Sequence, residues 1–370
     1  MSEGEEKKNS LEELRQKIKE MNSLSDPNKL HTVSLSELYD TVYKSKPAVI
    51  EDFIYPGLCI LAGDSKIGKS LLVLQIGFHV ATGTELWDKR VTEGTVLYLA
   101  LEDQYARLQS RMYKMYGMES TDKLHFSVSA KSINDGLTEQ LTDFVRKYPD
   151  TNLIIIDTLQ KVRGVASEGY SYSKDYEFIS ALKSFSDRYG VCLLLVHHTK
   201  KEKDSDPFNN VNGTNGLMGS ADTTMVLSKQ SRTGLNAALH ITGRDQPDTV
   251  IKISKNPETL IWNLDEFETQ IYKEPPDPLL EKLSQKLTEY GYEWCGTATE
   301  LASFLDVDMP PNKLSMKLNV SASKLLDTYS VEYSNTHTHD GRRIKLCRKE
   351  EASVTVGDDG DGKTDRGILS

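Results

Sequence analysis

Long apolar runs are missing from this 370-residue sequence, and none reaches the about 18 residues that a membrane-spanning helix requires. The opening residues, MSEGEEKKNS, also lack the apolar core of a secretory signal peptide. The four cysteines lie far apart and form no C-x-x-C pair, so neither a zinc site nor a disulfide framework is indicated. We therefore expect a cytoplasmic protein without a membrane partner.

An excess of basic residues is missing as well. The chain has 45 Lys and Arg against 55 Asp and Glu, a formal net charge of −10. This balance argues against a protein whose whole surface wraps nucleic acid, although it leaves local basic patches open. At about 150 residues per domain, the length suggests two or three domains.

Along the sequence, a polar N-terminal segment precedes a long region in which strand-like and helical patterns alternate. Residues 1–31, rich in Glu, Lys, Ser and Asn, are expected to form a tail or a docking helix. From 32 to 274, β-rich apolar runs alternate with helical patterns, which is typical of an α/β domain with a mostly parallel sheet. The expected strands are 58–62, 96–101, 124–128, 153–156 and 191–196, and the expected helices are 70–81, 104–116, 137–148 and 176–189. Short strands without intervening helices follow at 224–227, 237–242, 250–253 and 260–262, so the domain should end in antiparallel strands.

Prolines at 275, 276 and 278 mark a linker to a second domain, which we place at 275–349. Helical patterns at 279–290, 299–305 and 312–326 precede two strands that turn at 339–341. Three helices and a hairpin are the outline of a small α+β winged-helix domain. The acidic, glycine-rich residues 350–370 are expected to be disordered.

The strongest motif is Gly63-Asp64-Ser65-Lys66-Ile67-Gly68-Lys69-Ser70, a full match to the phosphate-loop pattern G-x-x-x-x-G-K-[ST]. It follows an expected strand and begins an expected helix, which is the structural context that a phosphate loop requires. The glycines let backbone N–H groups surround a phosphate, and the helix N-terminus adds partial positive charge. Lys69 would reach the β- and γ-phosphates of ATP, and Ser70 would ligate Mg²⁺.

Two acids follow buried strands and should meet at the same edge of the sheet. Asp157 follows four apolar residues and is the candidate for the Mg²⁺ shell together with Ser70; its alternative role is a helix cap. Glu102 follows another apolar run and could polarise the attacking water. Its alternative role is at the start of the helix after Asp103.

Two histidines, His197 and His198, end a third strand. Successive strand residues face opposite sides, so only one of the two should point at a γ-phosphate. The other, or both, would be structural, and the spacing does not choose between them.

These residues together resemble the RecA-like hexameric ATPases, and most closely the RepA-type replicative helicases of plasmids, phages and other mobile elements. The resemblance runs from residue 49 to 256. It implies a homohexameric P-loop ATPase of the AAA kind, with ATP and Mg²⁺ as cofactors bound between subunits and single-stranded DNA in a central channel. An arginine from the neighbouring subunit completes the site in this family. The segment Gly243-Arg244-Asp245 resembles that position, so Arg244 is the candidate, unless it merely pairs with Asp245 or Asp248.

Polar loops at 158–173 and 199–216 correspond to the loops that line the channel in the family. They carry cations suited to a nucleic-acid backbone: Lys161, Arg163, Lys200, Lys201 and Lys203. The alternative is a solvated loop, because neighbouring acids neutralise the second group of lysines.

The winged-helix segment 312–348 has seven basic and three acidic residues, a local excess of four positive charges. We expect a DNA contact there, with three lysines on one helical face and two arginines after the turn: Lys313, Lys317, Lys324, Arg342 and Arg343. The same fold often binds proteins instead, so duplex DNA and a replication protein are both candidate partners.

Helicase activity is the leading functional hypothesis. A DNA-dependent ATPase that loads or regulates another factor is the alternative among enzymes. A DNA-binding regulator that uses ATP only as a conformational ligand is the alternative from another class, and Glu102 argues against it. No Asn-Lys-x-Asp motif for guanine is present, which favours ATP over GTP.

Overall fold

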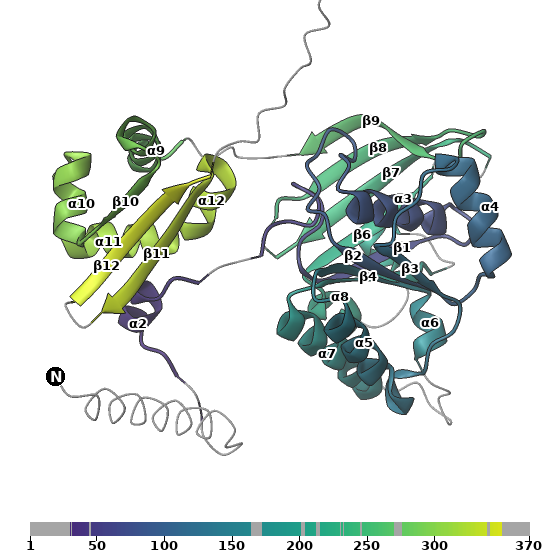
Figure 1. Ribbon diagram of the computed structural model, residues 1–370. Helices are drawn as coiled ribbons and strands as arrows, with labels where there is room; N and C mark the ends of the chain where they lie inside the picture. The colour runs from purple at the N-terminus through teal and green to yellow at the C-terminus, as the bar shows by residue number, and fades with distance from the viewer. Residues whose placement is uncertain are drawn as a thin grey trace, which may run out of the picture. The chain divides into compact units, whose positions relative to one another are not determined.

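The computed structural model describes residues 30, 32–43, 46–163, 172–200, 204–211, 215–229, 231, 233–244, 246–269, 276–338 and 341–349. The chain divides into two compact units, which we describe separately (Figure 1). The larger unit is Lys46–Glu274, and the smaller combines Met1–Ser45 with Pro275–Ser370. Over the described ranges, no helix has the length and apolar character to cross a bilayer.

A nine-stranded sheet forms the centre of the larger unit, with the strand order β3-β2-β4-β5-β1-β6-β7-β8-β9. The parallel strands are β1 (Gly57–Gly63), β2 (Thr95–Ala100), β3 (Leu124–Ser127), β4 (Thr151–Asp157), β5 (Cys192–His198) and β6 (Thr223–Ser228). The antiparallel strands are β7 (Asn236–Gly243), β8 (Thr249–Lys255) and β9 (Trp262–Thr269). The predicted α/β fold, with a mostly parallel sheet that ends in antiparallel strands, is confirmed.

Helices cover both faces of the sheet, which explains why its central strands are apolar throughout. One face packs against α3 (Lys69–Thr82) and α4 (Tyr105–Tyr116), and the other against α5 (Leu137–Lys147), α6 (Leu159–Val162), α7 (Tyr172–Tyr189) and α8 (Asn215–Ser220) (Figure 1). Successive residues of β1 alternate between the two cores: Cys59 and Leu61 lie in one, and Leu58 and Ile60 in the other. Short 3₁₀ turns are present at Ile133–Asp135 and Pro207–Asn210.

The smaller unit has its own apolar core and a three-stranded antiparallel sheet of order β10-β12-β11. Its elements are α2 (Leu35–Asp40), α9 (Pro278–Tyr290), β10 (Glu293–Gly296), α10 (Ala298–Leu305), α11 (Pro311–Val320), α12 (Ala322–Tyr329), β11 (Val331–Thr338) and β12 (Gly341–Arg348). Strand β10 was not anticipated, because four residues are too short for a clear alternating pattern.

Two further features of this unit differ from the sequence prediction. The single helix expected at 312–326 is interrupted at Ser321, a residue type that favours helix ends over helix interiors, and forms α11 and α12. Helix α2, which a Ser34–Glu37 capping box starts, groups with this unit. The expected start of the ATPase domain at residue 32 therefore differs from the observed division at Lys46.

Candidate nucleotide-binding site

The phosphate-loop residues 63–70 connect the end of β1 to the first turn of α3. Gly68 has a φ of 112°, in the left-handed region where a side chain is strained. A Cβ atom at this position would also lie 2.7 Å from Cζ2 of Trp262. Only glycine fits there, and it lets the loop enter α3 with the helix N-terminus facing the loop, a geometry suited to an anion.

Lys69 lies in the first turn of α3 with only 5% of its surface exposed. Its Nζ donates hydrogen bonds to the carbonyl oxygens of Gly63 at 2.7 Å and Asp64 at 2.9 Å. Burial lowers the pKa of Lys69 to about 8, although the nearby carboxylates of Asp157, Asp64 and Glu102 act in the opposite direction. A buried ammonium at a helix N-terminus is a natural partner for phosphate oxygens.

Asp157, at the carboxyl end of β4, is 6% exposed. Its Oδ2 accepts a hydrogen bond of 2.8 Å from the hydroxyl of Tyr98, and the side chain is also hydrogen-bonded to Ser70. Burial raises the pKa of Asp157, while these two hydrogen bonds and the charge of Lys69 oppose the increase. The adjacent hydroxyl and carboxylate oxygens fit Mg²⁺, which commonly uses one or two protein ligands together with phosphate oxygens and water.

Glu102 lies two residues beyond the end of β2, next to Asp157. The two strands pair at Ala100 and Asp157, and the hydroxyl of Thr158 donates to Oε1 of Glu102 at 3.3 Å. The alternative role at the start of α4 belongs to the neighbouring residue, because Asp103 accepts a hydrogen bond from the amide of Gln104 and forms ion pairs with two arginines of α4, Arg107 and Arg111. The exposed carboxylate of Glu102 is thus available at the same edge as Lys69 and Asp157.

The register of β1 and β5 distinguishes the two histidines. His197 pairs with Ala62 and is buried, whereas His198 pairs with Gly63, the first residue of the phosphate loop. Nδ1 of His198 lies 3.5 Å from the hydroxyl oxygen of Ser65. Burial and, to a lesser extent, the charge of Lys69 lower the pKa of His198. His198 is therefore the histidine on the phosphate-loop side.

Arg244 lies at the opposite edge of the sheet. It follows β7, whose last residue pairs with Thr223 at the start of β6, and β6 runs parallel to β1. Its guanidinium donates to the carbonyl oxygen of Gly219 at 2.8 Å and lies 3.9 Å from Asp222. The described residues thus pair it with Asp222 rather than Asp248, and Asp245 lies outside them. About five strand residues, or about 16 Å, separate it from the phosphate loop of its own chain.

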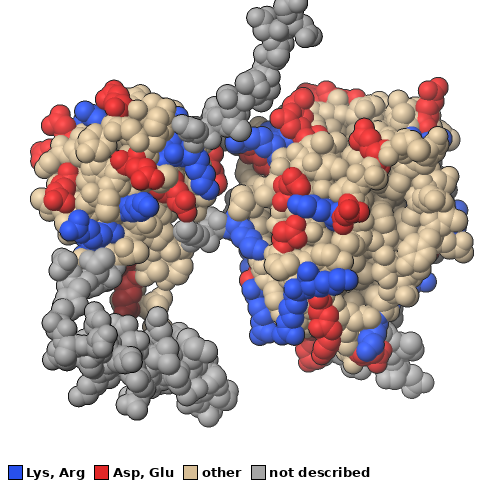
Figure 2. Space-filling model, viewed as in Figure 1, with Lys and Arg blue, Asp and Glu red and all other residues tan. Residues whose placement is uncertain are grey.

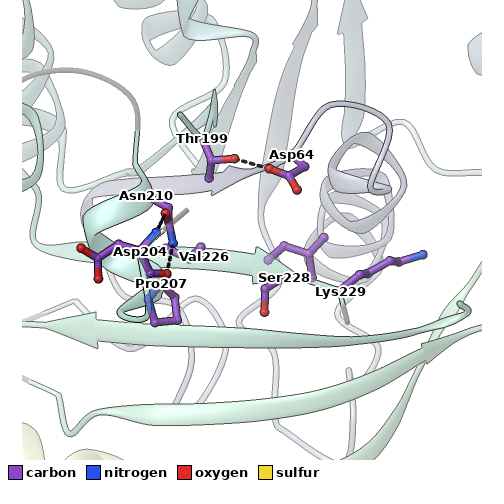
Figure 3. A pocket seen from close by; sticks show the side chains of 9 residues that line it. Asp64, Thr199, Asp204, Pro207, Asn210, Val226, Ser228 and Lys229 are labelled. Carbon is purple, nitrogen blue, oxygen red and sulfur yellow. Dashed lines mark hydrogen bonds between the residues drawn. The ribbon is translucent and has the colours of Figure 1, made fainter. Parts of the chain in front are cut away.

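A cavity of 320 Å³ lies beside the phosphate loop (Figure 3). Its lining residues come from the loop, the segment after β5 and the end of β6: Asp64, Thr199, Asp204, Pro207, Asn210, Val226, Leu227, Ser228 and Lys229. The hydroxyl of Thr199 donates to Oδ1 of Asp64 at 2.5 Å, and Asn210 exchanges hydrogen bonds with the backbone of Asp204. The segment after β5 is thereby connected directly to the phosphate loop.

The candidate DNA-binding cations are distributed over both units. Lys161 on α6 and Lys200 after β5 are exposed, and Arg163 is half-buried. Lys201 and Lys203 lie outside the described residues.

In the smaller unit, Lys313 and Lys317 lie on α11, but the predicted shared face with Lys324 is wrong, because Lys324 lies on α12. Arg342 and Arg343 are exposed on β12. Lys317 pairs with Asp277 and Arg342 with Asp40. Figure 2 shows acidic and basic side chains interspersed on the visible face of this unit.

Trp262 is a neighbour of the site that the sequence pattern did not indicate, since it lies 194 residues from Gly68. It is fully buried, and its indole N–H donates to the carbonyl oxygen of Gly68 at 3.4 Å. The side-chain amide of Gln75, in α3, makes two hydrogen bonds with the backbone of Trp262, at 2.8 and 2.9 Å. The edge strand β9 therefore supports the first turns of α3 from outside the site.

We expect Trp262→Phe to weaken MgATP binding several-fold, because it removes the N–H donor to the loop and part of the ring against Gly68. Trp262→Ala should cost about 3–5 kcal/mol of stability. Calorimetric nucleotide titration and thermal unfolding measure the two effects, with Trp294→Phe in the smaller unit as the matched control. Unchanged affinity in the folded Trp262→Phe variant would exclude the supporting role.

Comparison with known proteins gives one family match. Residues 25–204 match the protein family described as "AAA domain", a range that includes the phosphate loop, Glu102, Asp157 and both histidines. No curated protein matches the chain.

Several solved structures are similar to this chain. A DnaB-like replicative helicase, solved with its interactions with primase, has 14% identity, covers 68% of this chain and 71% of its own, and has a TM-score of 0.49. A KaiC-like protein from the archaeon Pyrococcus horikoshii OT3 has 15% identity, 61% and 99% coverage and a TM-score of 0.44. A third structure, of an ATPase domain, has 14% identity, 69% and 99% coverage and a TM-score of 0.48. The family match and the geometry of the phosphate loop agree that this chain carries a P-loop ATPase domain.

Proposed function

We propose that the protein is a RecA-like, DNA-associated ring ATPase of the RepA type, a replicative DNA helicase of a plasmid, phage or other mobile element. The observation that carries the proposal is the convergence of Lys69, Ser70, Asp157, Glu102 and His198 at one edge of a parallel sheet. Nucleotide binding alone needs the loop and its lysine. The additional exposed carboxylate beside Asp157 supports hydrolysis, because it can accept a proton from water.

In this proposal each residue has a separate task. Lys69 and the loop amides would hold the β- and γ-phosphates. Ser70 and Asp157 would hold Mg²⁺, which would supply positive charge beside the phosphates. Glu102, held by Thr158, orients the attacking water and takes its proton. His198 lies where it could contact the terminal phosphate and convey its loss to the segment after β5.

The position of Arg244 supports an assembly of several subunits. It is too far from the phosphate loop of its own chain to contact a nucleotide there, and its side chain is 55% exposed. A second copy could bring this arginine to the phosphates, which is what the resemblance to hexameric ATPases implies. The contacts with Gly219 and Asp222 also fit a structural role for Arg244. Whether the protein forms a ring therefore decides between a structural role and a role at the nucleotide of a neighbouring subunit.

The candidate channel segments follow the two strands that carry catalytic candidates. Lys161 and Arg163 follow β4 and Asp157, and Lys200 follows β5 and His198. The hydrogen bond between Thr199 and Asp64 connects the second segment to the loop. This arrangement supports coupling between nucleotide state and a grip on single-stranded DNA.

The smaller unit supports a winged-helix assignment by its element order. A helix, a short strand, three further helices and a hairpin follow one another, and the short strand β10 pairs with the second strand of the hairpin. In this proposal, α11 and the hairpin bind duplex DNA or a replication protein.

Steady-state ATP hydrolysis with and without oligo(dT) tests the proposal. We expect single-stranded DNA to stimulate turnover several-fold, because the DNA-contacting segments adjoin Asp157 and His198. Lys161→Ala should reduce stimulation without abolishing basal turnover, and Lys252→Ala, at an exposed position of strand β8, is the matched control. Stimulation without strand separation would favour a loader or regulator over a helicase. Hydrolysis indifferent to DNA would favour a nucleotide-switched regulator.

A further inference from the structure

Helix α2 lies against the part of the smaller unit that would contact DNA. The side-chain amide of Asn319, in α11, donates to the carbonyl oxygen of Tyr39 at 2.9 Å. Arg342, in β12, forms an ion pair with Asp40 at 3.0 Å. Figure 1 shows α2 next to α11 and the end of the β11–β12 hairpin. A segment from the start of the chain therefore contacts both α11 and the hairpin.

Asn319 connects these elements at one point. It is 2% exposed, and its Oδ1 accepts hydrogen bonds from the hydroxyl of Tyr333 at 2.8 Å and the amide of Asn335 at 3.1 Å, both in β11. Its remaining amide hydrogen bond goes to α2. The contact between α11 and the hairpin would thus persist without α2, because separate hydrogen bonds hold it.

The attachment of α2 is weak by several measures. None of its six residues is buried, and Leu35 and Leu38 are 63% and 43% exposed. A helix of this length does not persist alone in water. The Asp40–Arg342 pair is exposed on both sides, and such surface pairs contribute little to stability. Helix α2 can therefore detach without unfolding the unit's core.

The charges indicate what could displace it. Asp40 holds the guanidinium of Arg342 through a carboxylate, and a phosphate of a DNA backbone offers the same kind of oxygen acceptor. Lys313 is exposed on α11, one of the elements that α2 contacts. The carboxylates of Glu37 and Asp40 would repel an approaching backbone.

We propose that α2 is a displaceable lid, which competes with duplex DNA for the face formed by α11 and β12. This inference rests on the proposed DNA-binding role of the smaller unit. DNA binding exchanges the Asp40 carboxylate for a phosphate on Arg342 and releases α2, residues 35–40, from α11 and β12.

The test measures the affinity of the full-length protein for a fluorescein-labelled random-sequence duplex at fixed salt. Asp40→Asn should raise the affinity about twofold to fivefold, because the lid loses its ion pair. Glu289→Gln, on α9, removes the same charge elsewhere in the unit and controls for overall electrostatics. In an Arg342→Ala background, Asp40→Asn should give no larger gain than Glu289→Gln.

Amide hydrogen exchange provides a second readout. If duplex DNA displaces α2, amide exchange at residues 35–40 should become faster when duplex is added, since the hydrogen bond from the amide of Leu38 to the carbonyl oxygen of Ser34 opens. Equal affinities for Asp40→Asn and Glu289→Gln, or slower exchange in α2 with DNA, would overturn the inference. Absence of duplex binding in all variants would also overturn it, and persistent DNA-stimulated hydrolysis in the same samples would show that the proposed ATPase function still stands.

Discussion

Lys69→Ala is expected to abolish MgATP binding, and with it all ATP turnover. The substitution removes the buried ammonium at the start of α3 and its hydrogen bonds to Gly63 and Asp64, which shape the loop. Charge-assisted hydrogen bonds contribute about 1.5–3 kcal/mol each, so the loss of two or more to phosphates weakens binding by about 10²-fold to 10⁴-fold. Calorimetric titration with MgATP measures the effect, and thermal unfolding verifies that the variant is folded. Lys252→Ala removes an exposed lysine from the same unit and should bind normally.

The pH dependence of wild-type binding provides a separate check on the same residue. Burial gives Lys69 a pKa of about 8 in the free protein, and phosphates stabilise the protonated form. Above this pKa, binding must take up a proton, so the affinity should fall by up to about tenfold per pH unit. Below it the lysine is already charged, and the affinity should not depend on this group. A constant affinity from pH 7 to 9 would contradict the assignment of Lys69 as the phosphate-binding cation.

Glu102→Gln is expected to leave MgATP binding intact while lowering hydrolysis by about 10²-fold to 10⁴-fold. Glutamine keeps the size of the side chain and an oxygen that accepts from Thr158, but it cannot take a proton from water. Single-turnover hydrolysis and nucleotide titration separate the two effects.

The neighbouring acid is the matched control for Glu102. Asp103→Asn weakens the ion pairs with Arg107 and Arg111, so it should lower thermal stability and leave turnover largely unchanged. Equal turnover in wild type and Glu102→Gln would remove Glu102 from the mechanism.

Local patterns were sufficient to predict most of the larger unit. The phosphate loop is a continuous motif, and its strand and helix follow from adjacent apolar residues. Asp157 and Glu102 could be placed at one edge because carboxyl ends of parallel strands meet there. The helix–strand alternation has the same local origin, since each pattern is complete within about a dozen residues.

Features that depend on distant contacts could not be predicted in this way. The choice between His197 and His198 requires the register of β1 with β5. Ser65 and His198, whose side chains lie close together, are 133 residues apart in the sequence. The support of Gly68 by Trp262 spans 194 residues. The position of α2 depends on side chains of α11 and β12, and no pattern in its own six residues identifies those partners. Contacts between distant residues are specified by packing rather than by local periodicity. For this reason the local elements could be predicted from the sequence and these contacts could not.

The position of α2 also has a consequence for how the protein folds during synthesis. Tyr39 and Asn319, which join α2 to α11, are separated by 280 residues, with the whole ATPase unit between them. The ribosome therefore releases α2 long before its docking surface exists. The ATPase unit can fold first, as domains generally do in order of synthesis. Only after residue 342 has emerged can Asp40 find its arginine, so the attachment of α2 is a late step of folding.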